Sequence, residues 1–176
     1  MAKPKLLILS DLFGGQHPEW INYYTNALES KFKIQYYDVL ELANIDASNL
    51  AEVDIHKQFI NGGIDKAVET LLKLETDKVT VLGFSIGGTI AWKASLQGLK
   101  TTHLFAVSST RLRYETEAPN CEIKLFFGDQ DSNKPNSNWF LDLKIPSEIL
   151  QYQNHQLYLD EKNAVVICCQ VLSFKS

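Results

Sequence analysis

The sequence predicts an α/β protein with a doubly wound, mostly parallel sheet of six strands and helices on both faces. Short apolar runs alternate with longer mixed segments along almost the whole chain, and several of the longer segments carry apolar residues at helical spacing. Parallel strands need crossover connections, which the longer segments supply. The 176 residues contain no repeat or linker-like tract, so we expect a single domain over residues 1–176.

The strands are expected where short runs of aliphatic, β-branched and aromatic residues occur. These runs are Lys5–Ser10, Ile34–Val39, Lys78–Gly83, His103–Val107, Glu122–Phe127 and Glu148–Tyr152. The third run is apolar enough to lie at the centre of the sheet. The first apolar run, Leu6–Leu9, is too short for a secretory signal and is ended at once by Asp11, so a buried strand is the better interpretation.

Helices are expected in the segments that connect these strands. The predicted helices are Pro18–Phe32, Asn49–Leu74, Ile86–Gly98, a short one at Asn136–Leu143, and Lys162–Phe174. Apolar residues recur on one face of the first, second and last of them. Gly62 and Gly63 weaken the middle of the second helix and allow a break there.

Composition and charge exclude several functional classes. Lys and Arg number 17 against 21 Asp and Glu, which gives a formal net charge of −4 and no basic footprint for nucleic acid or an anionic membrane. No stretch approaches the roughly 20 apolar residues that span a bilayer. Cys121, Cys168 and Cys169 have no zinc-site spacing and suit no disulfide framework, so we expect a reducing, cytoplasmic location.

The strongest chemical signal is the run Gly83-Phe84-Ser85-Ile86-Gly87, which is followed by Gly88. It matches G-x-S-x-G and lies between a predicted strand and a predicted helix, where a sharp turn needs flanking residues without bulk. Such a turn exposes the serine hydroxyl at the edge of the sheet, near a helix N-terminus that favours negative charge. Ser85 is therefore the predicted nucleophile, and the alternative is a tight turn in which this serine caps the helix.

A serine hydroxyl needs a base to act as a nucleophile, and that base needs a carboxylate to orient it. His155 follows the sixth predicted strand, in a loop on the same edge as Ser85, and is the predicted base. His17 follows the first strand and stays an alternative for a catalytic or substrate-contacting role. His56, in a helical stretch, and His103, at the other edge of the sheet, are expected to be structural.

The carboxylate is expected in the loop after the fifth strand, Gly128-Asp129-Gln130-Asp131. Asp131 is the preferred acid, because Asp129 lies closer to the strand end and suits a loop cap. Both remain candidates on this reasoning. A Ser-His-Asp arrangement works without a metal or an organic cofactor, so none is expected.

An oxyanion that forms at Ser85 needs two preorganised donors. The backbone N–H of Ile86 follows the nucleophile, and Leu12 is the candidate in the loop after the first strand. Asp11 is unusual there, because an anion would repel the oxyanion, and it is expected to cap the strand end or to shape the loop.

Arg111 follows the fourth strand, where it could hold a substrate carboxylate or phosphate or could lie in a solvated loop. The candidate substrate-binding residues are Asp11, Phe13, Phe84 and Arg111.

With these motifs the sequence resembles the α/β-hydrolase superfamily over nearly the whole chain. The likeness rests on the G-x-S-x-G run, on the Gly128–Asp131 stretch, on the late His155, and on the chain order Ser85, Asp131, His155. Members of the superfamily commonly carry the acid at the end of a Gly-x-x-Asp stretch and the base after the last strand. The resemblance therefore implies a minimal α/β-hydrolase fold and favours Asp131 as the acid.

Within the superfamily the chain is similar to small dienelactone-hydrolase-like proteins. Their first loop often has an acidic residue, an apolar residue, Phe and Gly, as Asp11-Leu12-Phe13-Gly14 does here. By this likeness Leu12 supplies the second oxyanion N–H. The dienelactone hydrolases proper use a cysteine nucleophile, and this chain has Ser85 in that place.

About 14 residues separate the fourth and fifth strands, which leaves no room for a helical lid between them. We therefore expect an open site and a serine hydrolase of carboxylesterase type. It would act on a small carboxylester or thioester through an acyl-enzyme, with a small-molecule acyl substrate and no nucleic-acid or membrane partner. The alternative is a non-catalytic binding protein that retains the fold.

Overall fold

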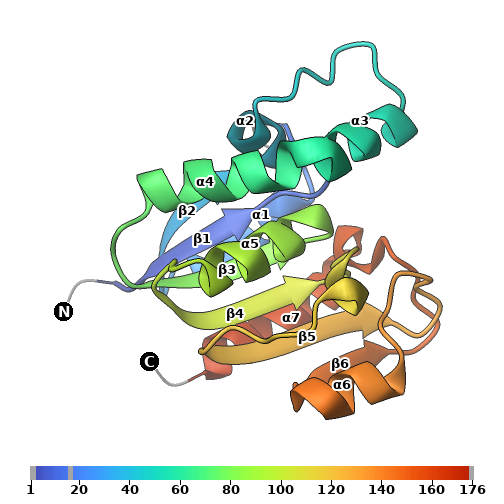
Figure 1. Ribbon diagram of the computed structural model, residues 1–176. Coiled ribbons are helices and arrows are strands. Elements are labelled where there is room, and N and C mark those ends of the chain that lie inside the picture. Colours follow the sequence, from blue (N-terminus) through green and yellow to red (C-terminus); the bar gives the residue numbers. More distant parts are fainter. Residues whose placement is uncertain (1–2, 16–17, 175–176) are drawn as a thin grey trace.

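The computed structural model describes residues 3–15 and 18–174 and has a six-stranded sheet with the order β2-β1-β3-β4-β5-β6 (Figure 1). The pairings between neighbouring strands are all parallel. The strands are β1 (Lys5–Leu9), β2 (Lys33–Tyr37), β3 (Val79–Phe84), β4 (Thr101–Val107), β5 (Glu122–Gly128) and β6 (Ser147–Leu150). The predicted doubly wound sheet is confirmed, and its described pairings are parallel throughout.

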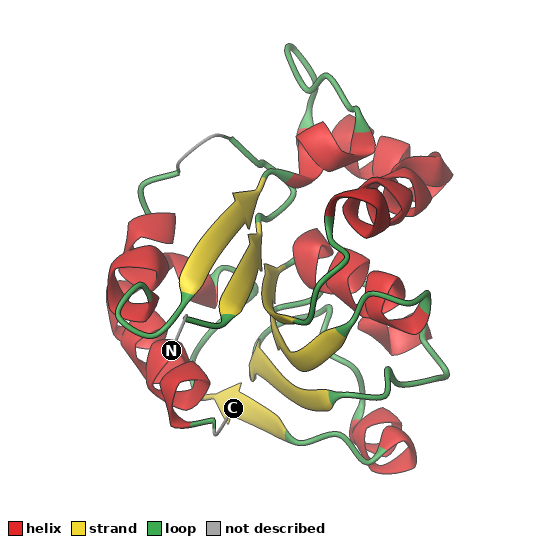
Figure 2. Ribbon diagram, turned by 90° about the vertical axis from the view of Figure 1, so that its left-hand side faces the viewer, coloured by secondary structure: helices red, strands yellow, loops and turns green. Residues whose placement is uncertain are grey.

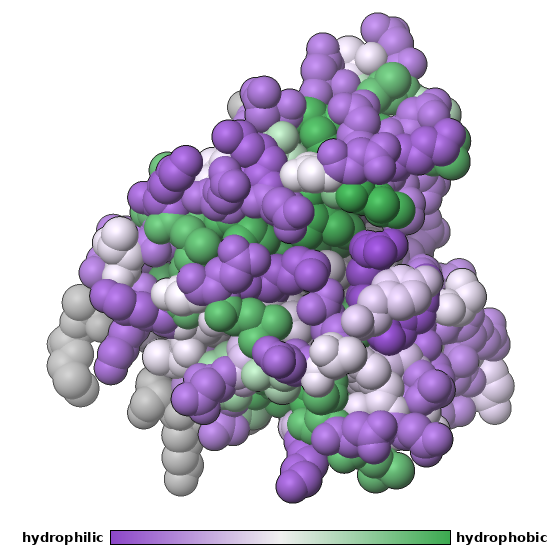
Figure 3. Space-filling model, in the orientation of Figure 1, coloured by the Kyte–Doolittle hydropathy of each residue, from purple (hydrophilic) through white to green (hydrophobic). Residues whose placement is uncertain are grey.

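Helices cover both faces of this sheet, as Figure 2 shows. The helices are α1 (Ile21–Leu28), α2 (Val39–Ala43), α3 (Glu52–Gln58), α4 (Ile64–Leu74), α5 (Ile86–Leu96), α6 (Ser137–Leu143) and α7 (Glu161–Ser173). One apolar core lies between the sheet and α1 with α7, and the other lies between the sheet and α2, α4 and α5. In Figure 3, hydrophobic side chains gather where α4 and α5 lie side by side, between more hydrophilic surroundings.

Strand β1 contributes side chains to both apolar cores. Leu7 and Leu9 belong to the core under α4 and α5, whereas Leu6 and Ile8 belong to the core under α1 and α7. Successive side chains of a strand point to opposite faces, so a central strand covered on both sides must be apolar at every position. The six residues of β3 are likewise all buried, which explains its position at the centre of the sheet.

The long helix predicted over Asn49–Leu74 is broken where the paired glycines stand. A kink at Phe59–Gly63 separates α3 from α4, with Asn61 and Gly62 outside helical geometry and Gly62 at φ 110°. Glycine adopts this conformation without the steric cost that a Cβ brings. The break that the two glycines allow is thus present, and it forms a kink between α3 and α4.

Helix α2 was not predicted, and the second strand is correspondingly shorter than expected. Asp38 has extended backbone geometry, and its side chain accepts the Leu40 N–H at 2.9 Å, so it caps a helix where the prediction continued the strand to Val39. The first predicted helix, Pro18–Phe32, is shortened to α1 because its first residues form a turn. The last predicted strand ends at Leu150, before a turn in which Tyr152 has φ 60°.

The carboxyl ends of the strands meet at one edge of the sheet, toward the right of Figure 1. Loops that follow β1, β3, β5 and β6 therefore come together there. None of the described helices is long and apolar enough to cross a membrane.

Candidate active site

Ser85 stands in a sharp turn between β3 and α5, with φ 51° and ψ −120°, a backbone conformation that is strained for a residue with a Cβ. The glycines around it are required by close packing. A Cβ on Gly83 would lie 2.6 Å from the Cα of Gly88, and a Cβ on Gly87 would overlap the main-chain oxygen of Ser10. The G-x-S-x-G spacing is thus explained by the approach of α5 to the strands, and it fixes the direction of the Ser85 side chain.

A chain of hydrogen bonds connects three of the predicted residues. Ser85 Oγ lies 3.0 Å from His155 Nε2, and His155 Nδ1 lies 3.0 Å from Asp131 Oδ2. The Asp131 side chain is fully buried, and its Oδ1 accepts the Asn133 N–H at 2.8 Å. A carboxylate only accepts hydrogen bonds, so Nδ1 of His155 carries the proton and Nε2 is free to accept from the serine hydroxyl.

Asp129, the other candidate acid, has a different place. It is exposed, and its Oδ1 accepts the main-chain N–H of Gln153 at 3.1 Å, so it ties the end of β5 to the loop after β6. The structure therefore brings Asp131, and not Asp129, to His155. His17, the alternative histidine, lies outside the described residues.

Two backbone donors face the same pocket as Ser85. The N–H groups of Ile86 and Leu12 donate no hydrogen bond within the described residues, and both residues line the pocket. The loop that carries Leu12 is held by the residue that caps α2, because Asp38 Oδ2 accepts the Gly15 N–H at 2.7 Å. These two backbone N–H groups without an acceptor belong to residues beside Ser85 and stay the candidate donors for an oxyanion.

Asp11 shapes this loop from inside and does not line the pocket. It is buried, its Oδ1 accepts the Phe13 N–H at 3.1 Å, and its Oδ2 accepts the Tyr158 hydroxyl at 3.0 Å. Burial raises the pKa of Asp11, and the hydrogen bonds from Tyr158 and the backbone oppose this rise. Its assignment to substrate binding is therefore corrected, whereas its alternative role in shaping the loop matches these contacts.

The raised pKa of Asp11 makes stability depend on pH in a defined direction. Because its pKa is raised above the ordinary value of 3.8, Asp11 keeps its proton in the folded protein at pH values where the same carboxyl group in the unfolded chain has already lost it. The contribution of this group is full below about pH 4 and is lost as the pH rises through the raised pKa. Asparagine does not titrate, so the free energy of unfolding of Asp11→Asn should increase relative to that of wild type as the pH rises through the Asp11 pKa. Urea unfolding at several pH values measures this difference. A difference between the two proteins that is constant with pH would contradict this expectation.

A pocket of about 470 Å³ opens beside Ser85. It is lined by the first loop, by α3 and by the loops after β3, β4, β5 and β6, through Leu12, Phe13, Glu52, Val53, His56, Ser85, Ile86, Thr110, Asn133, His155, Gln156 and Tyr158. The contribution of α3 was missed, and His56, expected to be structural, lines the pocket. Within the described residues, no group of three or more His, Cys, Asp or Glu is arranged as a metal site.

The other candidate substrate-binding residues differ in their position relative to the pocket. Phe13 lines the pocket and is 53% exposed, as a substrate-contacting side chain should be. Phe84 is completely buried, with its ring 4.6 Å from that of Tyr24, because it is the last residue of the buried strand β3. Arg111 lies over the ring of Tyr114 at 4.9 Å and lines a separate depression beside α4 and α5. As candidate substrate contacts, Phe84 is therefore too deeply buried to reach a ligand, and Arg111 lies apart from the pocket beside Ser85.

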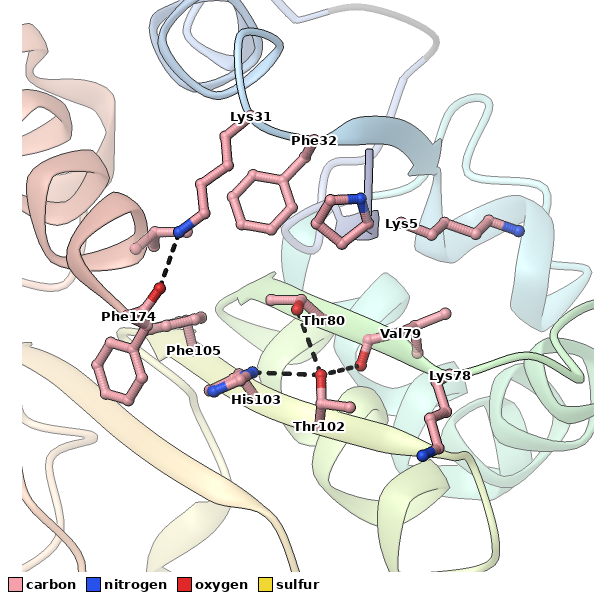
Figure 4. Close-up of a pocket in the computed structure, with 12 residues that line it drawn as sticks. Lys5, Lys31, Phe32, Lys78, Val79, Thr80, Thr102, His103, Phe105 and Phe174 are labelled. Atoms are coloured by element: carbon pink, nitrogen blue, oxygen red, sulfur yellow. Dashed lines mark hydrogen bonds between the residues drawn. The ribbon is translucent and has the colours of Figure 1, made fainter. Parts of the chain in front are cut away.

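A second cavity, of about 190 Å³, lies at the opposite edge of the sheet, between the ends of α1 and α7 (Figure 4). Several of its polar groups already have partners in the protein. Lys31 Nζ donates to the carbonyls of Leu172 and Phe174 at 2.9 and 2.8 Å and so closes the end of α7. His103 packs edge to face against Phe174, in agreement with the structural role expected for it. This edge therefore holds the two helices against the sheet.

No protein-family model matches the sequence, and no curated protein matches it. Solved structures do match. A hydrolase of the alpha/beta superfamily from Xanthomonas campestris pv. campestris has 17% identity, a TM-score of 0.67, and coverage of 97% of this chain and 98% of that chain. A carboxylesterase from Bacillus subtilis has 14% identity, a TM-score of 0.68, and coverage of 98% of this chain and 83% of that chain. A dienelactone hydrolase-like promiscuous phosphotriesterase from metagenomic libraries has 13% identity, a TM-score of 0.67, and coverage of 96% and 85%. Identities this low show a common fold, and the activity must be argued from the residues of this chain.

Proposed function

We propose that this chain, which has the α/β-hydrolase fold, is a serine hydrolase that cleaves small carboxylic esters or thioesters through an acyl-enzyme. The observation that carries the proposal is the hydrogen-bonded series Ser85, His155, Asp131, with both links at 3.0 Å and the serine in a strained turn. A serine that only capped a helix would need neither partner. The structural neighbours are hydrolases, which supports the same reading.

The geometry accounts for each step of acyl transfer. His155 Nε2 removes the proton from Ser85 as Oγ attacks the acyl carbonyl, and the backbone N–H groups of Ile86 and Leu12 donate to the oxyanion. Asp131 keeps the proton of His155 on Nδ1 and stabilises the imidazolium. The leaving alkoxide or thiolate then takes the proton from Nε2, which leaves the acyl group on Ser85. Water attacks this ester with His155 as the base and releases the acid and the free enzyme.

The pocket supports a small acyl group. Its volume of about 470 Å³ is at the lower end of small-molecule sites. Phe13 and Val53 offer exposed apolar surface at the pocket, at 53% and 58% exposure. The segment from β4 to β5 adds only a short 3₁₀ turn, Leu112–Tyr114, and no covering helix. A short aliphatic or aromatic acyl chain fits this arrangement better than a long lipid chain.

The test is intact mass spectrometry after treatment with a fluorophosphonate. We expect a single adduct on wild type and none on Ser85→Ala, because only a serine activated by a base attacks the phosphorus at a useful rate. Ser137→Ala, which removes an exposed serine of α6, is the matched control and should label as wild type does. Absence of an adduct on every protein would sink the proposal and favour a non-catalytic binding protein. An adduct that persists on Ser85→Ala would mean that a residue other than Ser85 is the nucleophile.

A further inference from the structure

One arginine joins the loop after β4 to the loop after β5 at the wall of the Ser85 pocket. Arg113 Nη1 donates to the carbonyl of Thr110 at 2.7 Å, to the carbonyl of Asn133 at 3.1 Å and to Asn133 Oδ1 at 2.9 Å. Thr110 and Asn133 therefore approach the same nitrogen atom and lie next to each other, and both line the pocket. The Arg113 guanidinium also lies over the ring of Tyr114 at 4.7 Å, which limits its movement.

The side-chain amide of Asn133 has a fixed orientation. An arginine can only donate hydrogen bonds, so the atom at 2.9 Å from Arg113 must be the amide oxygen, and the NH₂ group points the other way. The main-chain N–H and carbonyl of Asn133 are also taken, by Asp131 and Arg113. The NH₂ group is the polar group of this residue that has no partner within the described residues, and it belongs to a pocket-lining side chain.

Thr110 adds a second group that lacks a partner. Its hydroxyl is buried and makes no hydrogen bond within the described part of the chain, although its carbonyl is held by Arg113. A buried polar group without a partner destabilises the fold, so an acceptor that reaches it is bound favourably. Both unpartnered groups thus belong to pocket-lining residues that Arg113 already holds in place, and such preordering favours binding.

We infer that Asn133 and Thr110 form an acceptor-binding subsite, and that the enzyme prefers esters that carry a second oxygen acceptor, a ketone or a carboxylate, besides the scissile group. The inference rests on the proposed function and names its substrate class. The pocket then has an apolar wall with Phe13 and Val53 and a donor wall with Asn133 and Thr110. A site built to hydrogen-bond its substrate discriminates more strongly than an apolar site of equal size, because an unmatched substrate leaves its donors unpaired.

The first test compares three para-nitrophenyl esters of equal chain length: valerate, levulinate with a ketone, and hemiglutarate with a carboxylate. We expect wild type to have a higher kcat/KM for levulinate or hemiglutarate than for valerate. Asn133→Asp retains the acceptor for Arg113 but replaces the NH₂ group by a second acceptor. It should lower the levulinate-to-valerate ratio by about tenfold, and the hemiglutarate ratio by more, because it also adds like-charge repulsion. The intrinsic reactivities of the esters enter the ratios of wild type and variant equally, so they cancel when the ratios of the two enzymes are compared.

The matched control is Asn136→Asp, the same change three residues along the chain and outside the pocket. Asn136 caps α6 by accepting the Trp139 N–H at 3.0 Å, a role that aspartate fills equally well, so both ratios should stay at the wild-type value. Thr110→Val should lower the levulinate ratio, and Thr110→Ser should restore it. Equal ratios in wild type and Asn133→Asp, with melting temperatures showing both proteins folded, would overturn the inference.

A binding measurement separates this inference from the proposed function. In Ser85→Ala, which cannot form an acyl-enzyme, calorimetric titration with methyl levulinate and methyl valerate should still show tighter binding of the levulinate. This preference should be lost in the double variant with Asn133→Asp. If wild type forms no fluorophosphonate adduct but the preference persists, the hydrolase proposal fails and the subsite stands. If the adduct forms but the two esters bind equally, the subsite fails and the hydrolase proposal stands.

Discussion

Asp131→Asn is expected to lower kcat/KM for ester hydrolysis by about 10⁴-fold, the scale of the corresponding change in serine proteases. Asp131 Oδ2 accepts from His155 Nδ1 at 3.0 Å, and Oδ1 accepts the Asn133 N–H. The asparagine oxygen would keep the bond from Asn133, because an N–H can pair only with an acceptor. The asparagine NH₂ group would then face Nδ1, which moves the histidine proton to Nε2, where it can no longer take the proton of Ser85.

The measurement is steady-state hydrolysis of para-nitrophenyl esters, with the rate of fluorophosphonate labelling as a second readout. Asp129→Asn is the matched control, because Asp129 lies two residues earlier, is exposed, and accepts only a backbone N–H from Gln153 that an asparagine oxygen can also accept. We expect this variant to retain nearly all the activity. Equal losses in the two variants would contradict the assignment of the acid to Asp131.

The positions of Ser85, Asp131 and His155 could be predicted because each depends on local chain signals and one topological rule. G-x-S-x-G marks a turn whose sterics are local, and the loops after parallel strands must meet at one edge. The choice of Asp131 over Asp129 also followed from local spacing, since the residue nearer the strand end of β5 ties down the loop. Nothing in this reasoning required knowledge of how distant side chains pack.

The pocket walls could not be predicted for the opposite reason. Glu52, Val53 and His56 belong to α3, which a kink at Phe59–Gly63 separates from α4, and local sequence signals do not give the angle of such a kink. Asp38 marked the start of α2, but an aspartate at the end of a strand run also suits a turn, so the cap was not recognised. Thr110 and Asn133 come together at the pocket because Arg113 joins two loops, and its bond to Asn133 spans 20 residues of sequence.

Phe84→Ala is expected to reduce the free energy of unfolding by about 3–5 kcal/mol. The Phe84 ring is completely buried and contacts three aromatic rings, those of Trp20, Tyr24 and Tyr158, at centroid distances of 4.8, 4.6 and 5.5 Å. Removal of the ring leaves a cavity that these large side chains cannot fill by small movements, so both the transfer free energy and the contacts are lost. Urea unfolding followed by circular dichroism measures the change.

Phe13→Ala supplies the contrast, because Phe13 is 53% exposed and lines the Ser85 pocket. Its loss should change the free energy of unfolding by less than about 0.5 kcal/mol, as surface substitutions usually do. It should instead raise KM for aromatic and branched esters, since it removes apolar surface from the site. The sequence alone assigned both phenylalanines to substrate binding. If Phe84→Ala left stability unchanged and raised KM in the same way, the buried position of Phe84 would be wrong and that first assignment would be right for both residues.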